Sequence, residues 1–259
     1  INQAEELYKG MGMLNASHYT NYPPINQLCF LIAALFSNHN ILGSVIVMRV
    51  LIIAADIGII QIGSKILTKL NINSKRIYLY ALNPFIIIEL TGNLHFEPVM
   101  LFFLVWALYK LQQQKWIIAA ILIACSVSVK LIPLFFLPLF FQWFLNKKNS
   151  LNFSKLILFY SLVLSITFLL FLPFYSTQLI NNYMNSVGLW FKNFEFNASF
   201  YYIFREIGYL FRGHNEIAII GKILPILSVL FLTILTFFKN NKSLKSLITS
   251  MLFGLSFYY

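Results

Sequence analysis

The chain has 259 residues, of which 59% are hydrophobic and only 10% are charged. Soluble domains carry about 25% charged residues. This composition therefore excludes an ordinary soluble protein and predicts an all-α, polytopic transmembrane helical bundle with interfacial helices and loops on its outer face. The formal net charge of +11 would suggest nucleic-acid binding in a soluble protein. The positions of the basic residues, given below, assign them to membrane orientation instead, so no nucleic-acid partner is expected.

The N-terminal segment, residues 1–42, is expected to be exoplasmic and to carry interfacial helices. Its first residues, Gln3 to Gly10, follow a short amphipathic helical pattern. The segment Tyr22-Pro23-Pro24 fixes an extended backbone, so a new helix should start just after Pro24. The apolar stretch 28–36 that follows is too short to span a bilayer, which favours an interfacial or re-entrant helix.

Apolar runs after this segment predict a transmembrane core of about six spans in residues 43–174. A loop over residues 175–216 and further spans in 217–259 follow, the last of them truncated at the C-terminus. Lys130 and Pro133 interrupt one run, which predicts a helical hairpin or a kinked pair there. The eight candidate spans cover about residues 43–63, 77–91, 98–112, 116–130, 131–146, 156–174, 217–238 and 246–259.

The basic residues predict the orientation. Twelve of the 19 Lys and Arg residues lie in loops that contain no Asp or Glu, and by the positive-inside rule these loops face the cytoplasm. Asp56 lies inside the first span and Glu89 at the outer border of the second. The other acidic groups fall on the opposite side with all four histidines, so the working surface should be exoplasmic. The twelve are Lys65, Lys69, Lys75, Arg76, Lys110, Lys115, Lys147, Lys148, Lys155, Lys239, Lys242 and Lys245.

Polar side chains gather at the outer end of the second candidate span. Glu89, Asn93, His95 and Glu97 follow one another there within nine residues. Ionisable groups at the membrane border are costly unless they meet water, one another or a ligand. A polar substrate contact and simple interfacial capping both account for them. Two donors, His95 and Glu97, are too few for a metal site, so neither a metal nor a cofactor is expected.

Two cations outside this cluster are further candidates for an anion contact. Lys130 lies between two apolar runs near the outer face, where it either binds a phosphate or reaches up to the lipid headgroups. Arg205 ends a stretch of aromatic residues, which suit sugar stacking and phosphate binding, or an interfacial aromatic belt with an anchoring arginine.

Arg49 and Asp56 lie seven residues apart on one face of the first span, with about 10 Å of rise between them. We expect a structural role for this pair rather than a catalytic one. Asp56, deep in the span, should accept hydrogen bonds in the protein interior.

The order of these motifs resembles the GT-C superfamily of polytopic glycosyltransferases, which take a sugar from a polyprenyl-phosphate carrier. Within it the pattern is similar to the lipid-linked mannosyl- and glucosyltransferases. The motifs are Tyr22-Pro23-Pro24, Met48-Arg49 with Asp56, Asn93 to Glu97, Ser128-Val129-Lys130 with Pro133 and Pro138, and Asn197-Ala198-Ser199 with Arg205.

The resemblance implies a hexosyltransferase, with mannose favoured as the sugar, that acts without a bound nucleotide. The donor would be a polyprenyl-phosphate sugar, and the acceptor an exoplasmic glycan, lipid or protein. In the family, basic residues hold the carrier phosphate as it leaves, and a histidine lies near the donor. The substrate-binding residues implied in this way are Tyr22, Asn93, His95, Glu97, Lys130 and Arg205.

The family's catalytic base is an acidic residue that precedes the Tyr-Pro-Pro segment. Only Glu5 and Glu6 occupy that stretch here, and the helix they belong to looks like the one that follows the family's aspartate. Because the chain starts at Ile1 and stops within an apolar run, we expect a fragment whose base lies upstream of Ile1. The catalytic residue is therefore unknown, and this fragment is expected to be inactive.

A multi-span membrane transporter is the alternative from another class, and another enzyme of lipid-linked glycans is a second one. Transporters usually contain internal repeats and polar groups near the bilayer midplane. No repeat is evident here, and only Asp56 is deep. The chain is expected to be a multi-pass integral membrane protein in contact with membrane lipid. The bacterial inner membrane is favoured over the endoplasmic reticulum, because the composition fits an AT-rich genome.

Overall fold

The computed structural model describes residues 4–13, 17, 19–37, 40–146, 151–193 and 199–258. These residues form helices and no strands, so the predicted all-α fold is confirmed. The chain divides into two compact units. The first comprises residues 1–18, 22–135 and 157–175, and the second residues 19–21, 136–156 and 176–259.

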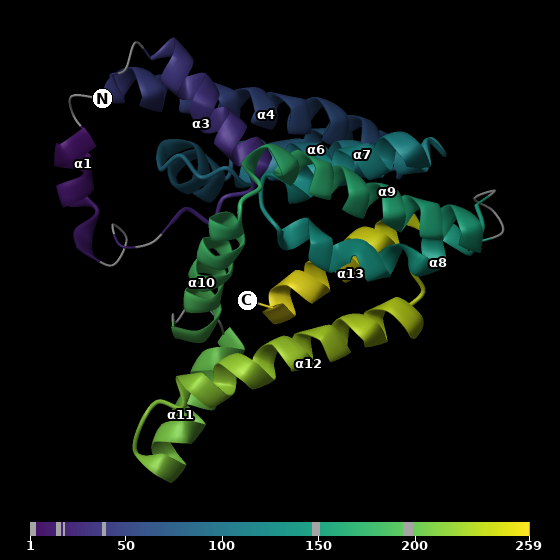
Figure 1. The fold of residues 1–259 in the computed structure, drawn as a ribbon. Coiled ribbons are helices and arrows are strands. Elements are labelled where there is room, and N and C mark those ends of the chain that lie inside the picture. Colours follow the sequence, from purple (N-terminus) through teal and green to yellow (C-terminus); the bar gives the residue numbers. More distant parts are fainter. Residues whose placement is uncertain are drawn as a thin grey trace. The chain divides into compact units, whose positions relative to one another are not determined.

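The first unit is organised around a long central helix, α4 (Figure 1). The helices α3 and α6 both pack against α4, and α7 turns back to pack along α6. Asn40 caps the start of α4, because its Oδ1 accepts a hydrogen bond from the Gly43 amide at 3.3 Å. The core between these helices includes Cys29, Ile52, Phe96 and Val129. The elements are α1 (Ala4–Gly10), α3 (Pro24–Phe36), α4 (Ile41–Lys69), α6 (Glu97–Gln112), α7 (Trp116–Val127) and most of α9 (Phe153–Phe171).

Helix α3 begins at Pro24, as the two prolines predict, and its 13 residues are too few to cross a bilayer. Three segments of the described chain are long and apolar enough to do so. They are α4, residues Phe153–Phe174 (α9 with the short turn η5, Leu172–Phe174) and α12 (Ile217–Phe237). A fourth is obtained if η2 (Phe85–Gly92) and α6 count as one span, bent by 114°.

Two of the stretches predicted as single spans are broken into short helical pieces. Residues 77–91 fall into η1 (Ser74–Ile77), α5 (Tyr78–Ala81) and η2, which is a π-helix. Residues 131–146 form the 3-10 helix η3 (Ile132–Phe140) and the short α8 (Phe141–Phe144). These two candidate spans are therefore not single regular α-helices. Pro84 lies at the break between α5 and η2, and Pro138 lies inside η3. Proline lacks the amide that a continuing α-helix needs, so neither stretch can form one regular α-helix.

The second unit is built on α12, which packs against α10, α11 and α13 (Figure 1). The Gln142 amide of α8 donates to the carbonyls of Thr236 (2.8 Å) and Phe237 (3.1 Å) and so closes the end of α12. Residues 175–216, expected as an exoplasmic loop, contain two amphipathic helices. The remaining elements are α10 (Thr177–Asn193), α11 (Ser199–Arg212) and α13 (Leu244–Tyr258).

Two glycines let neighbouring elements come close to α4. A Cβ at Gly58 would lie 2.4 Å from the Phe102 ring of α6, and one at Gly63 would lie 2.7 Å from Ile77 Cδ1. Side chains at either position would push the packed element away. These contacts hold α6 and η1 at fixed distances from α4.

We expect Gly58→Leu to lower the free energy of unfolding by about 1–3 kcal/mol, because the added side chain overpacks the α4–α6 contact. Thermal unfolding of the purified protein in detergent measures the change. The matched control is Gly188→Leu on α10, where an added Cβ meets nothing within 4 Å. Equal melting temperatures for the two variants would show that the α4–α6 contact is not tightly packed.

Candidate functional site

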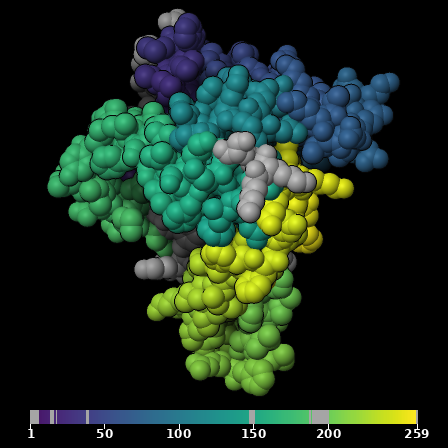
Figure 2. Space-filling view, turned by 90° about the vertical axis from the view of Figure 1, so that its right-hand side faces the viewer, coloured from purple at the N-terminus to yellow at the C-terminus, as the bar shows by residue number. Residues whose placement is uncertain are grey.

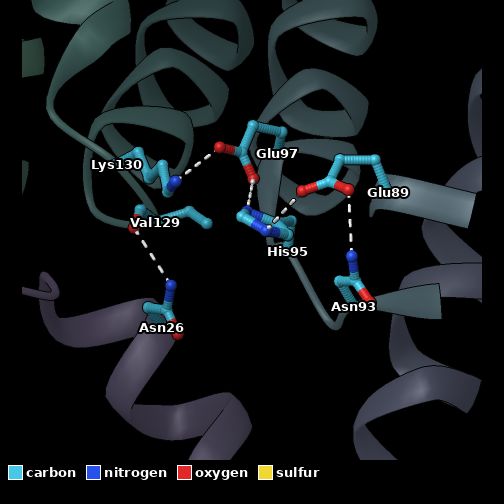
Figure 3. A network of polar contacts seen from close by, with 7 residues as sticks. All are labelled: Asn26, Glu89, Asn93, His95, Glu97, Val129 and Lys130. Carbon is cyan, nitrogen blue, oxygen red and sulfur yellow. Dashed lines mark hydrogen bonds and ion pairs between the residues drawn. The ribbon is translucent and has the colours of Figure 1, made fainter. Parts of the chain in front are cut away.

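The site forms where η2 ends and α6 begins. The π-helix stops at Gly92, and Leu94 takes a left-handed backbone conformation with φ +59°. Such a φ is uncommon for a residue other than glycine and stores about 1–3 kcal/mol of strain. The His95 amide donates back to the Leu90 carbonyl at 2.8 Å and closes the turn. The turn brings Asn93, His95 and the first residue of α6, Glu97, close together (Figure 3).

Five polar side chains form one connected network here (Figure 3). Lys130 Nζ donates to Glu97 Oε1 at 2.5 Å. Glu97 Oε2 lies 3.8 Å from His95 Nδ1, and His95 Nε2 lies 3.3 Å from Glu89 Oε1. Asn93 Nδ2 donates to the other Glu89 oxygen at 2.9 Å. Each ring nitrogen of His95 thus faces a carboxylate.

The network runs from a half-buried end to an open one. The side chains of Lys130 and Glu97 are 22% and 27% exposed, whereas those of His95 and Glu89 are 42% and 43% exposed. The partial exposure leaves these groups accessible to a ligand. At the less exposed Lys130 end, water screens the charges of Lys130 and Glu97 less strongly. The polar groups therefore line a surface that a ligand can reach.

The start of α3 holds the loop that carries Lys130. The Ile25 amide donates to the Ser128 carbonyl at 2.8 Å, and the buried Asn26 side chain donates to the Val129 carbonyl at 3.5 Å. Lys130 Nζ also lies 6.0 Å from the centre of the Tyr22 ring, at the outer limit of a cation–π contact. The Tyr-Pro-Pro segment and the Ser-Val-Lys segment are thus joined.

Two charged residues of α4 support the end of η2. Arg49 donates from Nε to the Thr91 carbonyl (3.3 Å) and from Nη2 to the Gly92 carbonyl (2.9 Å). Asp56 accepts from the Tyr80 hydroxyl at 2.6 Å and from the Thr91 hydroxyl at 3.2 Å. The prediction that Asp56 accepts interior hydrogen bonds is confirmed. Both residues hold the backbone from which the network projects.

The structure brings together five of the six predicted substrate-binding residues, namely Tyr22, Asn93, His95, Glu97 and Lys130. The sixth, Arg205, belongs to α11 in the second unit. There its Nη2 lies 3.0 Å from Glu206 Oε1, and its guanidinium carbon lies 4.8 Å from the centre of the Tyr202 ring. Its part in the site stays a prediction.

Sequence reasoning left two members of this region out of the candidate set. Glu89 was grouped with the polar cluster but not among the six substrate-binding residues that the resemblance implies, although its place four residues before Asn93 fits a contact along one helix face. Asn26 gave no signal, because an asparagine at a helix start is usually read as a capping residue. The side chains of Glu5 and Glu6, and the segment around Asn197, lie outside the described residues.

The network contains groups that can bind hydroxyls and groups that can contact an anion. Carboxylates and the Asn93 amide bind hydroxyl groups, while an ammonium group and an imidazole can neutralise an anion. No group of three or more His, Cys, Asp or Glu side chains is arranged to hold a metal ion within the part of the chain that the structure describes.

A family model described as "Alpha-(1->6)-mannopyranosyltransferase, N-terminal domain" matches residues 5–146, which is more than half of the chain. The matched range contains the whole network and the residues of α3 and α4 that support it. No curated protein and no solved structure matches the chain.

Proposed function

Because this chain belongs to the alpha-(1->6)-mannopyranosyltransferase family, we propose that it transfers mannose from a polyprenyl-phosphate carrier to an exoplasmic glycan, lipid or protein acceptor. Membership of the family and the long apolar helices make it a membrane mannosyltransferase. The donor, the side of the membrane and the GT-C-type mechanism are the proposal. The observation that supports them most is the network of Glu89, Asn93, His95, Glu97 and Lys130.

In the proposed reaction the acceptor hydroxyl oxygen attacks the anomeric carbon of mannose. The bond from that carbon to the phosphate oxygen breaks, and the carrier phosphate leaves with the bonding electrons. The negative charge that builds up on the phosphate must be neutralised in the transition state. Lys130 and His95 are the groups of the network that can do this. The residue that takes the hydroxyl proton is not assigned.

The pairing of Lys130 with Glu97 is compatible with this role. An ammonium group has three N–H donors, and Glu97 engages one of them. Two donors can then face the phosphate oxygens. Glu97 would fix the direction of the lysine, while Glu89 and Asn93, at the more open end, would bind mannose hydroxyls.

The experiment supplies the purified full-length protein with radiolabelled mannose on a polyprenyl phosphate and with candidate acceptors. We expect labelled product, release of polyprenyl phosphate, and no transfer from a nucleotide-linked mannose. Transfer from the nucleotide sugar alone would show that the proposed donor is wrong. Solute uptake into proteoliposomes without any transfer would favour the transporter alternative.

The proposed orientation predicts which residues an impermeant thiol reagent reaches in intact cells. In a background with Cys29 and Cys125 replaced by alanine, cysteines at Lys75 and Lys115 should react only after permeabilisation. Cysteines at Asn93 and His214 should react at once. All four positions are exposed in the structure, so accessibility on the protein does not bias the comparison. Labelling of Lys75 and Lys115 in sealed cells would reverse the orientation and move the network to the cytoplasmic side.

A further inference from the structure

A strongly basic surface lies at the opposite end of the first unit from the network. Arg49, two turns into α4, contacts Gly92 just before α6 begins. Gly58 of α4 lies against Phe102 of α6, so the two helices run in the same direction. Lys69 Nζ lies 4.8 Å from the centre of the Tyr109 ring, so their C-terminal ends meet. The helix η1 packs against α4, and α7 begins beside the end of α6. This basic end, as we call it, carries Lys65, Lys69, Lys75, Arg76, Lys110 and Lys115.

The positive charge of the basic end is not compensated by the protein. Residues 57–88 and 98–146 contain no Asp or Glu. None of the six cations forms an ion pair with any residue that the structure describes. Cations of this kind, gathered on one surface, attract anions from the surroundings.

Two of the six cations lie at the C-terminal ends of long helices. Lys69 and Lys110 lie in the last turns of α4 and α6, where a cation complements the helix dipole. Each also lies over an aromatic ring, Lys69 over Tyr109 and Lys110 over Trp106. Lys75 and Arg76 lie in the last turn of η1, but this helix has only four residues. Both of them, and also Lys65 and Lys115, are exposed.

Exposed apolar side chains follow directly after two of these cations. Lys75 and Arg76 in η1 are followed by Tyr78 and Leu79 in α5, whose side chains are 54% and 76% exposed, and then by Leu82 at 69%. Ile77 between them is anchored against Gly63 of α4, so the segment is held in place. This blue segment projects at the upper right of Figure 2. Cationic groups beside exposed apolar side chains can bind a ligand that has both an anionic headgroup and apolar chains, whereas a small soluble anion would contact the cations alone.

We propose that the basic end binds anionic phospholipids of the surrounding membrane. Arg76 and Lys75 hold the headgroup phosphate, and the acyl chains lie along Tyr78, Leu79 and Leu82. The guanidinium group binds a phosphate through two parallel hydrogen bonds. Each Lys or Arg near an anionic lipid surface strengthens binding by about five-fold. This site does not depend on the proposed mannose transfer.

The test measures lipid binding to the purified full-length protein by native mass spectrometry, with phosphatidylglycerol and phosphatidylcholine as probes. We expect a clear preference for phosphatidylglycerol that salt weakens. The double variant Lys75→Ala/Arg76→Ala should weaken phosphatidylglycerol binding by about 25-fold and leave phosphatidylcholine binding unchanged. Lys9→Ala, which removes an exposed cation from α1 of the same unit, should bind both lipids as the unmodified protein does.

Further variants separate a lipid site from other anion sites and from misfolding. Leu79→Gln should weaken binding of phosphatidylglycerol but not of glycerol phosphate, which has no acyl chains. Arg76→Lys keeps the charge and should retain part of the preference. Equal binding of both lipids, an unchanged preference in the double variant, or competition by glycerol phosphate or an oligonucleotide as strong as by the lipid would each overturn the proposal.

Discussion

Lys130→Ala is expected to lower mannose transfer from the lipid-phosphate donor by about 10- to 150-fold, the loss of one charge-assisted hydrogen bond. The physical reason is that the leaving phosphate gains negative charge as the sugar bond breaks, and Lys130 is the strongest cation of the network. The decrease should appear in kcat/KM for the donor. Lys130→Arg should restore part of it, because a guanidinium group keeps the charge but changes the geometry.

The pairing with Glu97 requires a control, because removing the lysine also leaves a half-buried carboxylate without its partner. The variant Lys130→Met/Glu97→Gln removes both charges and keeps similar side-chain volumes. We expect this double variant to recover the melting temperature lost in Lys130→Ala but not the donor kcat/KM. Recovery of both would mean that Lys130 serves the fold alone and does not contact the phosphate.

Asp56→Ala is expected to lower the free energy of unfolding by about 2–6 kcal/mol, because two partly buried hydroxyl donors lose their acceptor at about 1–3 kcal/mol each. These donors are Tyr80 and Thr91, which meet Asp56 at 2.6 and 3.2 Å. Asp56→Asn keeps an acceptor oxygen and should cost less. Thermal unfolding in detergent gives the change, and Tyr80→Phe and Thr91→Val, which remove one donor each, should each cost about 0.5–1.5 kcal/mol.

The same substitution should also loosen the turn that carries the network. Thr91 is held by Asp56 through its side chain and by Arg49 through its carbonyl. Hydrogen exchange of the amides from Leu90 to His95 should therefore be faster in Asp56→Ala than in the unmodified protein. Exchange unchanged in this turn, together with an unchanged melting temperature, would refute the supporting role of Asp56.

Much of the architecture follows from composition, because hydropathy alone separates a membrane bundle from a soluble protein. The helix breaks were not predictable in the same way. Residues 85–92 are as apolar as a straight span, and hydropathy does not report the number of residues per turn that produces a π-helix. Pro84 and Pro138 were the available signals, and a proline excludes a regular α-helix around it without specifying the geometry that replaces it.

The candidate site shows a similar division. Glu97 and Lys130 could each be recognised as costly polar residues at the membrane border. Their contact joins positions 33 residues apart in the chain and depends on how α7 returns along α6. The support from Asn26 was missed for a related reason. Its partner is the Val129 carbonyl, and because every residue has a backbone carbonyl, the residue types do not indicate this contact. Sequence patterns identified the polar residues of the network but not the contacts that connect them.

The length of α4 has a consequence for the membranes in which the network can keep its shape. The helix has 29 residues and is about 43 Å long, whereas the hydrocarbon core of a bilayer is about 30 Å thick. The rise along the helix from Arg49 to Lys65 is about 24 Å. Both side chains are long and can reach outward to the headgroups, so the distance between their charged ends can match the thickness of the hydrocarbon core. Asp56 then lies close to the bilayer midplane. A thicker bilayer would draw Arg49 away from the carbonyls of Thr91 and Gly92, so bilayer thickness acts directly on the helix that supports the network.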